Sequence, residues 1–239
     1  MSFLYEHQGF CPCCEASVLF RAEDEWFRDS LLCSACGSIV RERAVALVMR
    51  EMFADLGRLA IHESSPGGRE FSAYLSRKAR AYTATYYFPD APLGAMVRGF
   101  QNQDLENQTF EDESFDMVVT LDVMEHVFDP EKVYAEIYRT LRPGGVYLHT
   151  FPISKRQVEA YERLAKLNVD GSVRLLTDAP TYHGDPVNEK GALVTFDYGY
   201  DISRQIAEWA PFDVRISRFW DRRHGVLGEH SEVVVCQKR

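Results

Sequence analysis

The sequence predicts an α/β protein with a mostly parallel central sheet, preceded by a small cysteine-bearing module. Two observations lead to this prediction. The stretch from Phe115 to Pro152 reads as a strand, a helix and a second strand, and further short apolar runs alternate with helical patterns along the chain. Near the N-terminus, two C-x-x-C pairs are separated by 18 residues. A chain of 239 residues has room for one α/β domain and one small module.

The Phe115–Pro152 stretch predicts one β-α-β unit. Asp116–Leu121 is a short apolar run that suits a strand buried on both faces. Asp129-Pro130 offers an N-cap and a first helical residue, and Val146–Phe151 reads as the next strand. Asp122 and Glu125-His126 follow the first strand directly. Polar groups at the C-terminal ends of parallel strands are where such sheets bind ligands, so these residues are candidates for a site.

Composition and charge narrow the class of protein. Hydrophobic residues make up 46% of the chain, which is ample for a core, and no apolar run reaches the ~18 residues that a membrane span needs. Residues 1–10 lack a basic start followed by an apolar segment, so we expect no signal peptide. The net charge of −9 argues against a broad nucleic-acid interface. We therefore expect a cytoplasmic protein that uses its six cysteines for metal rather than for disulfides.

The paired cysteines predict a structural zinc site. Cys11 and Cys14 form one C-x-x-C pair, and Cys33 and Cys36 form the other. Two tight turns of this kind present four thiolates to a tetrahedral ion and leave no position for water. An iron site with the same ligands and a pair of disulfides are the alternatives. Cys13 is a spare thiol that could compete with Cys14.

The N-terminal segment divides into a zinc ribbon over residues 1–38 and a linking helix over residues 39–57. Residues 1–57 carry nine acidic side chains and five arginines, which does not suit binding to a phosphate backbone. We expect instead a substrate lid, a homodimer contact or a surface for a protein partner. A stabilising appendage is the remaining interpretation of the ribbon.

The β-α-β stretch contains motifs that resemble those of a known family. The pieces FDMVV, DVMEHV and LRPGG, in this order, are similar to motifs of class I S-adenosylmethionine (SAM)-dependent methyltransferases with a type 11-like domain. The resemblance runs from about Leu59 to about Pro152. It implies a Rossmann-like sheet over residues 58–239 with an antiparallel C-terminal edge strand, and SAM as cofactor. It also places a substrate-covering insertion at about residues 153–200.

The resemblance assigns cofactor roles to the residues that follow each strand. In the family, the first strand ends in an acidic residue followed by glycines, and here Glu63 matches the acid and Gly67 the second glycine, while Ser65 and Arg69 replace the first and third. Tyr86 stands where the family has an acid for the ribose, with Asp90 as the alternative. The residues expected to contact the cofactor are Glu63, Ser64, Ser65, Gly67, Tyr86, Asp104, Leu105, Leu121, Asp122 and His126. Among them, Asp104 is expected to accept a hydrogen bond from the adenine amino group.

The other elements are expected in a set order. The predicted strands and helices are Ile39–Leu56 (helix), Leu59–Glu63 (strand), a helix through Leu75, Ala79–Tyr86 and Val97–Gln103 (strands), Ser154–Leu167 (helix), Gly191–Phe196 (strand), a helix capped by Asp201, and Phe212–Phe219 and Val233–Cys236 (edge strands). Substrate specificity should lie beyond Pro152, where the resemblance weakens.

Three residues are candidates for catalysis. His183 lies in a loop between Pro180 and Val187, with Asp185 beside it, and a histidine suits a general base because its pKa lies near neutrality. His224 is the second histidine candidate. The predicted function is methyl transfer from SAM to an oxygen or nitrogen of a small polar acceptor, such as a sugar or a biosynthetic intermediate. The alternatives are a non-catalytic SAM-binding or partner-docking protein, and an RNA methyltransferase.

Overall fold

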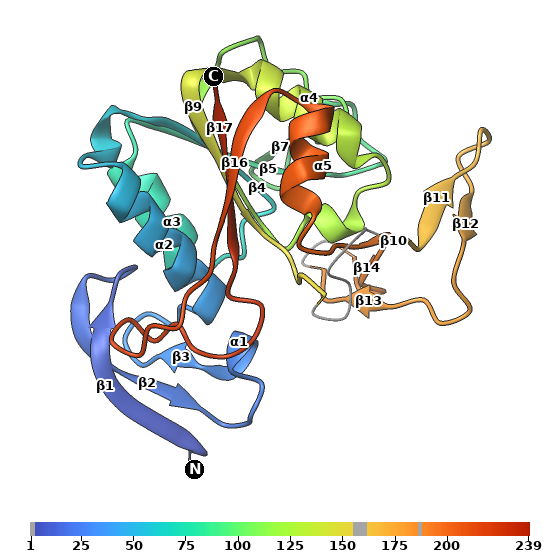
Figure 1. The fold of residues 1–239 in the computed structure, drawn as a ribbon. Coiled ribbons are helices and arrows are strands. Elements are labelled where there is room, and N and C mark those ends of the chain that lie inside the picture. Colours follow the sequence, from blue (N-terminus) through green and yellow to red (C-terminus); the bar gives the residue numbers. More distant parts are fainter. Residues whose placement is uncertain (1–2, 155–161, 186–187) are drawn as a thin grey trace.

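The computed structural model describes residues 3–154, 162–185 and 188–239. It contains a small N-terminal sheet and a large sheet flanked by helices (Figure 1). The small sheet has three antiparallel strands in the order β1-β2-β3. Its strands are β1 (Tyr5–Cys11), β2 (Ala16–Ala22) and β3 (Leu32–Cys33).

The large sheet has eight strands in the order β16-β17-β9-β8-β4-β5-β7-β6. They are β4 (Ala60–Ser64), β5 (Ala81–Tyr86), β6 (Met96–Val97), β7 (Phe100–Asn102), β8 (Phe115–Leu121), β9 (Leu141–Thr150), β16 (Phe212–Ser217) and β17 (Val233–Lys238). The strands β9, β8, β4, β5 and β7 are parallel, whereas β17 pairs antiparallel with both β9 and β16. The predicted fold class, a mostly parallel Rossmann-like sheet with an antiparallel C-terminal edge, is confirmed.

Helices cover both faces of the large sheet. The helices are α1 (Phe27–Ser30), α2 (Val40–Met52), η1 (Leu56–Arg58), α3 (Glu70–Lys78), η2 (Met124–His126), α4 (Pro130–Thr140) and α5 (Ile202–Trp209). Successive residues of β8 point to opposite faces, so Met117 and Val119 pack with α2 and α3, while Val118 packs with α4 and α5. This alternation between two apolar layers explains why the strands read as continuous apolar runs.

Local signals set most helix ends. Asp129 accepts a hydrogen bond from Lys132 N at 3.3 Å, and Pro130 is the first helical residue of α4, as predicted. The helix expected to run to Leu56 ends at Met52 instead, because Asp55 accepts from Gly57 N and starts a separate 3₁₀ turn. Asp201 precedes α5, but its side chain makes no capping hydrogen bond.

Two predicted elements are wrong. The strand expected at Val97–Gln103 is a tight hairpin of β6 and β7, because Arg98 and Gly99 both have positive φ and reverse the chain. The helix expected at Ser154–Leu167 is not helical where the structure describes it: Ala165–Leu167 is β11, which pairs with Val173–Leu175 (β12). Residues 155–161 of that prediction lie outside the described residues. The cross-strand pairing with β12 outweighs the local helical pattern of this segment.

The insertion between β9 and α5 forms short strand pairs in its described part. The strands are β10 (Glu162–Arg163), β11, β12, β13 (Tyr182–His183), β14 (Ala192–Leu193) and β15 (Phe196–Asp197). They pair as β10-β15, β11-β12 and β13-β14. The β11-β12 arm projects from the body of the protein (Figure 1). The strand predicted at Gly191–Phe196 corresponds to β14 and the start of β15.

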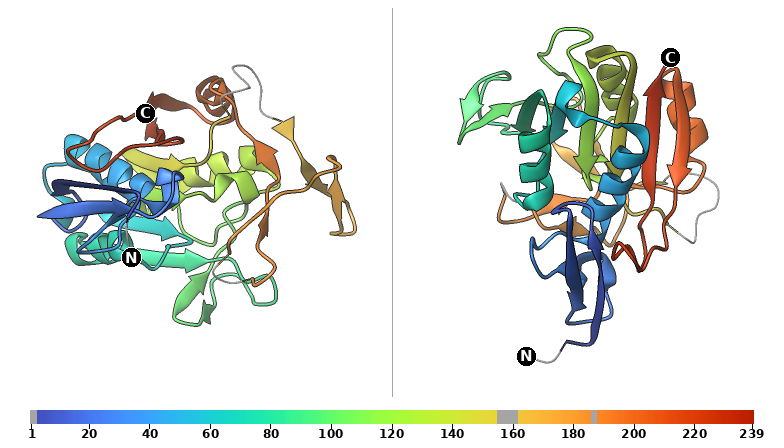
Figure 2. Two further views of the ribbon diagram at one scale, coloured as in Figure 1. Left: turned by 90° about the horizontal axis from the view of Figure 1, so that it is seen from below. Right: turned by 90° about the vertical axis from the view of Figure 1, so that its left-hand side faces the viewer.

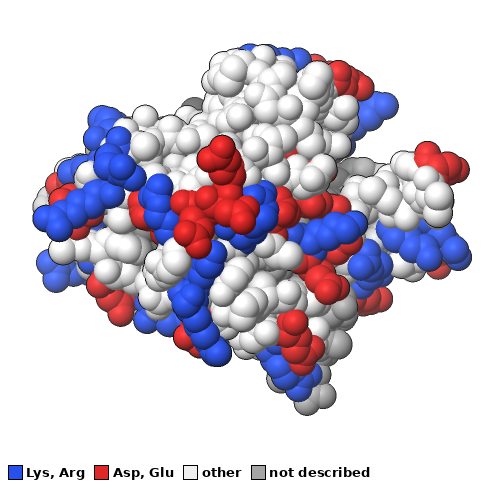
Figure 3. All heavy atoms as spheres, turned by 90° about the horizontal axis from the view of Figure 1, so that it is seen from above, with Lys and Arg blue, Asp and Glu red and all other residues white. Residues whose placement is uncertain are grey.

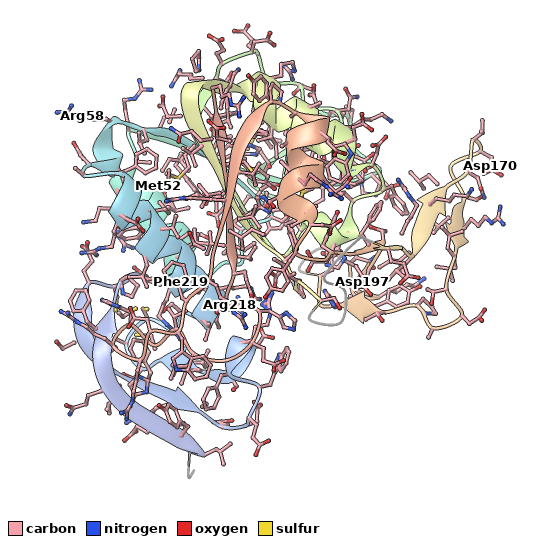
Figure 4. The ribbon with its side chains drawn as sticks, in the orientation of Figure 1. Met52, Arg58, Asp170, Asp197, Arg218 and Phe219 are labelled. Atoms are coloured by element: carbon pink, nitrogen blue, oxygen red, sulfur yellow. The ribbon has the colours of Figure 1, made fainter. Side chains whose placement is uncertain are left out.

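The small sheet packs on the large one through a continuous core. One apolar cluster contains Phe20 and Leu31 of the ribbon together with residues of α2, α3 and the large sheet. Arg43 is fully buried and donates to Leu31 O at 2.6 Å and to Gly225 O at 2.8 Å. The loop between β16 and β17 therefore reaches the ribbon, and Figure 4 shows Arg218 and Phe219 at this junction. The right-hand view of Figure 2 shows the ribbon at one end of the molecule.

The surface carries charges of both signs. On the face seen from above, lysines and arginines are interspersed with aspartates and glutamates (Figure 3). Within the described part of the chain, no helix has the length and apolarity required to cross a bilayer.

Candidate functional site

A cavity of about 950 Å³ lies at the C-terminal edge of the parallel strands. Four adjacent strands, β8, β4, β5 and β7, end at this cavity. The residues at or after these strand ends that line it are Ser64, Ser65, Tyr86, Tyr87, Gln103, Asp104, Leu105, Glu106, Asp122, Val123 and His126. The chain leaves β4 toward one side of the sheet and β8 toward the other, which makes this the switch point where such sheets bind ligands.

The opposite wall comes from the insertion. Its lining residues are Leu167, Gly171, Val173, Leu175, Tyr182, Gly184, Asp185, Asn188, Lys190, Gly191, Ala192 and Leu193. The β11-β12 arm supplies the apolar residues Leu167, Val173 and Leu175, and the β13-β14 hairpin supplies polar residues together with Ala192 and Leu193. The cavity therefore has a sheet-edge wall and a covering wall of different chemistry.

The turn after β4 brings backbone close to the cavity. Ser65 has φ of 56° and donates its N–H to Thr85 O at 2.8 Å, which holds the turn against the end of β5. Ser64 and Ser65, two of the expected cofactor contacts, line the cavity. A small side chain in a left-handed position is compatible with close approach of a ligand to backbone.

Glu63 and Gly67, two further expected cofactor contacts, do not line the cavity. The Glu63 carboxylate points into the protein, where it accepts from Ser72 Oγ at 2.9 Å and Tyr82 OH at 2.6 Å. Burial raises the pKa of Glu63 to about 7. A Cβ at Gly67 would meet Arg69 Nη1 at 3.2 Å, beyond the turn. Through these hydrogen bonds, Glu63 stabilises the end of β4 from the protein interior.

The end of β5 presents two tyrosines. Tyr86 lines the cavity, but its hydroxyl donates to Pro66 O. This hydrogen bond holds the neighbouring turn, and the hydroxyl proton is then not available to a ligand. Asp90 is exposed and is not part of the lining. Tyr87 also lines the cavity and is half exposed. Its ring offers a stacking surface that the sequence analysis did not identify.

The end of β7 presents Asp104 and Leu105. Asp104 Oδ1 accepts from Glu106 N at 2.8 Å, so the carboxylate both shapes a turn and faces the cavity. Glu106 in turn accepts from the backbone N–H groups of Phe128 and Asp129 at 2.7 and 2.9 Å. These two hydrogen bonds connect the segment after β7 to the segment after β8. The two lining segments are thereby held in a fixed relation.

Asp122 is anchored from three directions. It has φ of 55°, and its Oδ1 accepts from Thr150 Oγ1 at 2.9 Å and from Arg28 Nη2 at 2.8 Å. Its Oδ2 lies 3.1 Å from Arg41 Nε. Arg28 belongs to α1 of the ribbon and is almost fully buried, and Arg41 belongs to α2. Side chains of the N-terminal part therefore fix a lining residue of the cavity.

Leu121 and His224 lie away from the cavity lining. Leu121 packs against the core cluster shared with the ribbon. His224 lies in the loop between β16 and β17, where its Nδ1 is 2.6 Å from Asp221 Oδ2 and its ring contacts Phe10 of the ribbon. His224 is therefore not part of the cavity lining, because its loop packs against the ribbon.

His183 of the covering hairpin packs against His126 of η2. Their ring centroids are 5.1 Å apart. His126 Nδ1 lies 2.9 Å from the carbonyl oxygen of Leu193, and His183 Nδ1 lies 3.5 Å from Glu125 Oε1. Glu125 raises the pKa of His183. Figure 4 shows Asp197 of β15 in the same region, and Asp185 lines the cavity next to Gly184.

Glu125 was expected only to lie near a site, and the structure buries it there beside two histidines. It is 2% exposed, and among the described residues neither carboxylate oxygen receives a hydrogen bond. Buried carboxylates are normally paired, so an orphaned one is a signal of function. The Glu125-His126 pair in the sequence was the available clue, but the approach of His183 depends on the tertiary structure.

The four paired cysteines form a compact cluster. The Sγ atoms of Cys11, Cys14, Cys33 and Cys36 all lie within 4.8 Å of one another, with Cys11–Cys36 at 3.7 Å and Cys14–Cys33 at 3.8 Å. Four thiolates at about 2.3 Å from one tetrahedral ion would be about 3.8 Å apart. All six cysteines are free thiols, and Cys13 is buried outside this set of four.

Comparison with known proteins gives the family context. Residues 65–149 match the family described as Methyltransferase domain. The chain is 49% identical over 41 residues (17% of its length) to phosphoethanolamine N-methyltransferase 2 of Caenorhabditis elegans, and 36% identical over 74 residues (31%) to sterol 24-C-methyltransferase of Candida albicans. It spans only 9% and 18% of these two proteins.

A solved structure shows the same fold. The 1,6-didemethyltoxoflavin-N1-methyltransferase of Burkholderia thailandensis, with bound 1,6-didemethyltoxoflavin and S-adenosylhomocysteine, is 14% identical and has a TM-score of 0.50. The match covers 82% of this chain and 76% of that structure. Residues 65–149 thus match a methyltransferase domain, and the chain shares the fold of this solved methyltransferase.

Proposed function

We propose that this chain, with its methyltransferase domain at residues 65–149, transfers the methyl group of SAM to an oxygen or nitrogen of a small polar molecule. The single observation that carries the proposal is the cavity at the ends of β8, β4, β5 and β7, closed on its far side by the insertion. One wall suits a nucleoside cofactor, and the other wall supplies separate groups for an acceptor.

The cofactor would lie along the sheet edge. The turn at Ser64-Ser65, near the start of α3, would lie beside its carboxylate. Tyr87 and Asp104 flank the place of the adenosine, with Asp104 as acceptor for the adenine amino group. The sulfonium would then face Asp122 and His126. This order follows the sequence of strand ends and needs neither Glu63 nor Gly67 as a direct contact.

The acceptor would lie between His126 and the hairpin residues 182–185. In the reaction the S–CH₃ bond breaks as the new bond to oxygen or nitrogen forms, and the acceptor releases a proton. Alignment supplies much of the rate because the sulfonium is a good leaving group. The curated relatives are named for phosphoethanolamine and sterol acceptors, which supports a small-molecule acceptor here. His183 and Asp185 are the residues that we expect to act at the acceptor end.

A non-catalytic SAM-binding or partner-docking protein is the second candidate. The observation that favours it is the Tyr86 hydroxyl, which is bonded to Pro66 O where the family has an acid for the ribose. Calorimetry with S-adenosylhomocysteine, followed by an assay of SAM turnover with panels of small hydroxyl and amine compounds, separates the candidates. Binding with turnover supports the enzyme, and binding without turnover for any compound supports the second candidate. Methylation of RNA instead of a small molecule would support an RNA methyltransferase.

We also propose that the cysteine cluster holds one structural zinc ion. The spacing of the thiols fits tetrahedral coordination, and four protein ligands leave no open position. The ribbon would then serve the site by presenting Arg28 to Asp122. Its use as a homodimer or protein-docking surface, the domain boundaries given above and a cytoplasmic location remain predictions.

Replacing Asp104 with alanine should weaken binding of S-adenosylhomocysteine about tenfold or more. A hydrogen bond to a charged acceptor contributes roughly 1.5–3 kcal/mol, and Asp104 is the acid at the end of β7 that faces the cavity. Isothermal titration calorimetry measures the effect. Asp90→Ala is the matched control, since Asp90 is an exposed acid outside the lining, and equal losses in both variants would contradict the proposed adenine position.

Replacing Arg28 with methionine should weaken S-adenosylhomocysteine binding by about tenfold, which corresponds to about 1.4 kcal/mol. The change removes the buried partner that holds Asp122 in its left-handed turn. Arg21→Met is the control, because Arg21 is a ribbon arginine paired with Glu6 on the surface. Unchanged affinity in Arg28→Met, with the ribbon intact by circular dichroism, would show that the ribbon does not support the cavity.

A further inference from the structure

We propose that Glu125, His126 and His183 form a second metal site, which binds a divalent first-row transition ion in the wall of the cavity. One ligand atom from each of these residues lies within 4.8 Å of the other two. Glu125 and His126 come from η2, and His183 comes from β13 of the insertion. Two imidazoles and one carboxylate are a ligand set that suits such ions.

The hydrogen bonding of His126 leaves a lone pair for the ion. The Leu193 carbonyl can only accept, so the 2.9 Å contact requires a proton on His126 Nδ1. With its proton on Nδ1, the imidazole presents the lone pair of Nε2, which lies 3.9 Å from Glu125 Oε1. Metal-binding histidines commonly donate their other N–H to a backbone carbonyl in this way.

The spacing of the three groups fits ligands around one ion better than direct hydrogen bonds. Glu125 Oε1 is 3.5 Å from His183 Nδ1 and 3.9 Å from His126 Nε2, whereas hydrogen bonds between such atoms are roughly 2.7–3.2 Å long. Ligands at about 2.1 Å from a tetrahedral ion would be about 3.4 Å apart. Glu125 is buried without a hydrogen-bond donor among the described residues, so a cation would satisfy its charge.

The backbone that carries these ligands is rigidly held. Thr195 is fully buried, and it donates from its N–H to Glu125 O at 2.7 Å and from its hydroxyl to Val127 O at 2.5 Å. Tyr198 OH donates to Met124 O at 3.0 Å. The insertion therefore locks η2 in place from the side that also supplies His183. Such support from neighbouring groups is what a preformed ligand set requires.

The site would leave coordination positions open toward the cavity. Three protein ligands do not complete the shell of such an ion, and His126 and the neighbours of His183 line the cavity. Resting on the proposed function, we infer that an acceptor hydroxyl would bind the ion there and lose its proton to water in the cavity, as the methyl group leaves sulfur and bonds to that oxygen. The acceptor class is then an oxygen compound rather than an amine.

Metal analysis tests the site without any assay of activity. The full chain is equilibrated with Zn²⁺, dialysed and analysed by mass spectrometry. We expect two zinc ions per wild-type chain and about one in Glu125→Gln, which keeps the size of the side chain. Cys33→Ala should also retain about one, and His224→Asn, the matched control that removes an imidazole elsewhere, should retain two. One ion in the wild type, or two in Glu125→Gln, would overturn the proposal.

Cobalt provides a readout that needs no variant. With the cysteine site filled by zinc, Co²⁺ added to the wild-type chain should give absorption bands of nitrogen and oxygen ligation without thiolate charge-transfer bands. Absence of protein-bound Co²⁺ would overturn the site, leaving a protonated His183 as the partner of Glu125. Calorimetry with S-adenosylhomocysteine on the same samples keeps the two proposals apart: metal binding without cofactor binding would reject the proposed function alone.

Discussion

Replacing His183 with alanine is expected to lower the rate of methyl transfer by about 100-fold or more, with little change in the affinity for S-adenosylhomocysteine. Residues that assist loss of the acceptor proton, directly or by holding an ion that does so, typically contribute about 10²–10⁴ in rate, and His183 lies on the covering side of the cavity next to Glu125. Single-turnover rates measure the transfer step, and calorimetry measures the affinity.

The control for this variant is His224→Ala. His224 is bonded to Asp221 beside the ribbon, so its loss should leave the rate nearly unchanged. If the loss in His183→Ala appeared only as weaker acceptor binding at an unchanged maximal rate, His183 would shape the acceptor pocket without acting in the chemical step. If neither the rate nor acceptor binding changed, the acceptor would have to lie elsewhere.

Replacing Cys33 with alanine is expected to release the ribbon zinc and to unfold the ribbon locally. Binding of a structural zinc ion contributes roughly 10–16 kcal/mol in small metal-binding modules, and the three short strands of the ribbon have little core of their own. Because Arg28 is carried by the ribbon, we also expect S-adenosylhomocysteine to bind about tenfold more weakly. Zinc content, proteolysis of the N-terminal segment and calorimetry report the three effects.

Cys13→Ala is the matched control for the zinc ligands. Cys13 is as buried as Cys33, but it lies outside the set of four clustered thiols. This variant should keep its ribbon zinc and its protease resistance. A Cys33→Ala chain with the ribbon zinc still bound, or a Cys13→Ala chain without it, would reject the assigned ligand set.

The sheet and its ligand-binding edge could be predicted because they follow from local patterns. Apolar runs such as Asp116–Leu121 bury both faces of a strand, and Asp129-Pro130 starts the next helix. Parallel strands bring their C-terminal ends to one edge, so polar residues such as Asp104 and Asp122 had to lie near each other.

The direction of individual side chains could not be predicted in the same way. Glu63 and Tyr86 stand at the expected positions, yet Glu63 turns toward Tyr82 and the Tyr86 hydroxyl bonds to Pro66 O. The direction of each side chain depends on which hydrogen-bond partner is within reach after the helices and strands have packed. The segment Ala165–Leu167 is a further case, because pairing with β12 made it a strand where its own pattern suggested a helix.

The sequence by itself determined the parallel sheet, the line of polar residues along its edge and the four paired cysteines, since each depends on spacing within a short segment. Only the tertiary structure decided that Arg28 reaches Asp122, 94 residues along the chain, and that His183 approaches Glu125 and His126. No local pattern encodes such pairs, because the residues meet only after the ribbon and the insertion have packed against the sheet, where burial makes an unpaired charge costly and selects its partner.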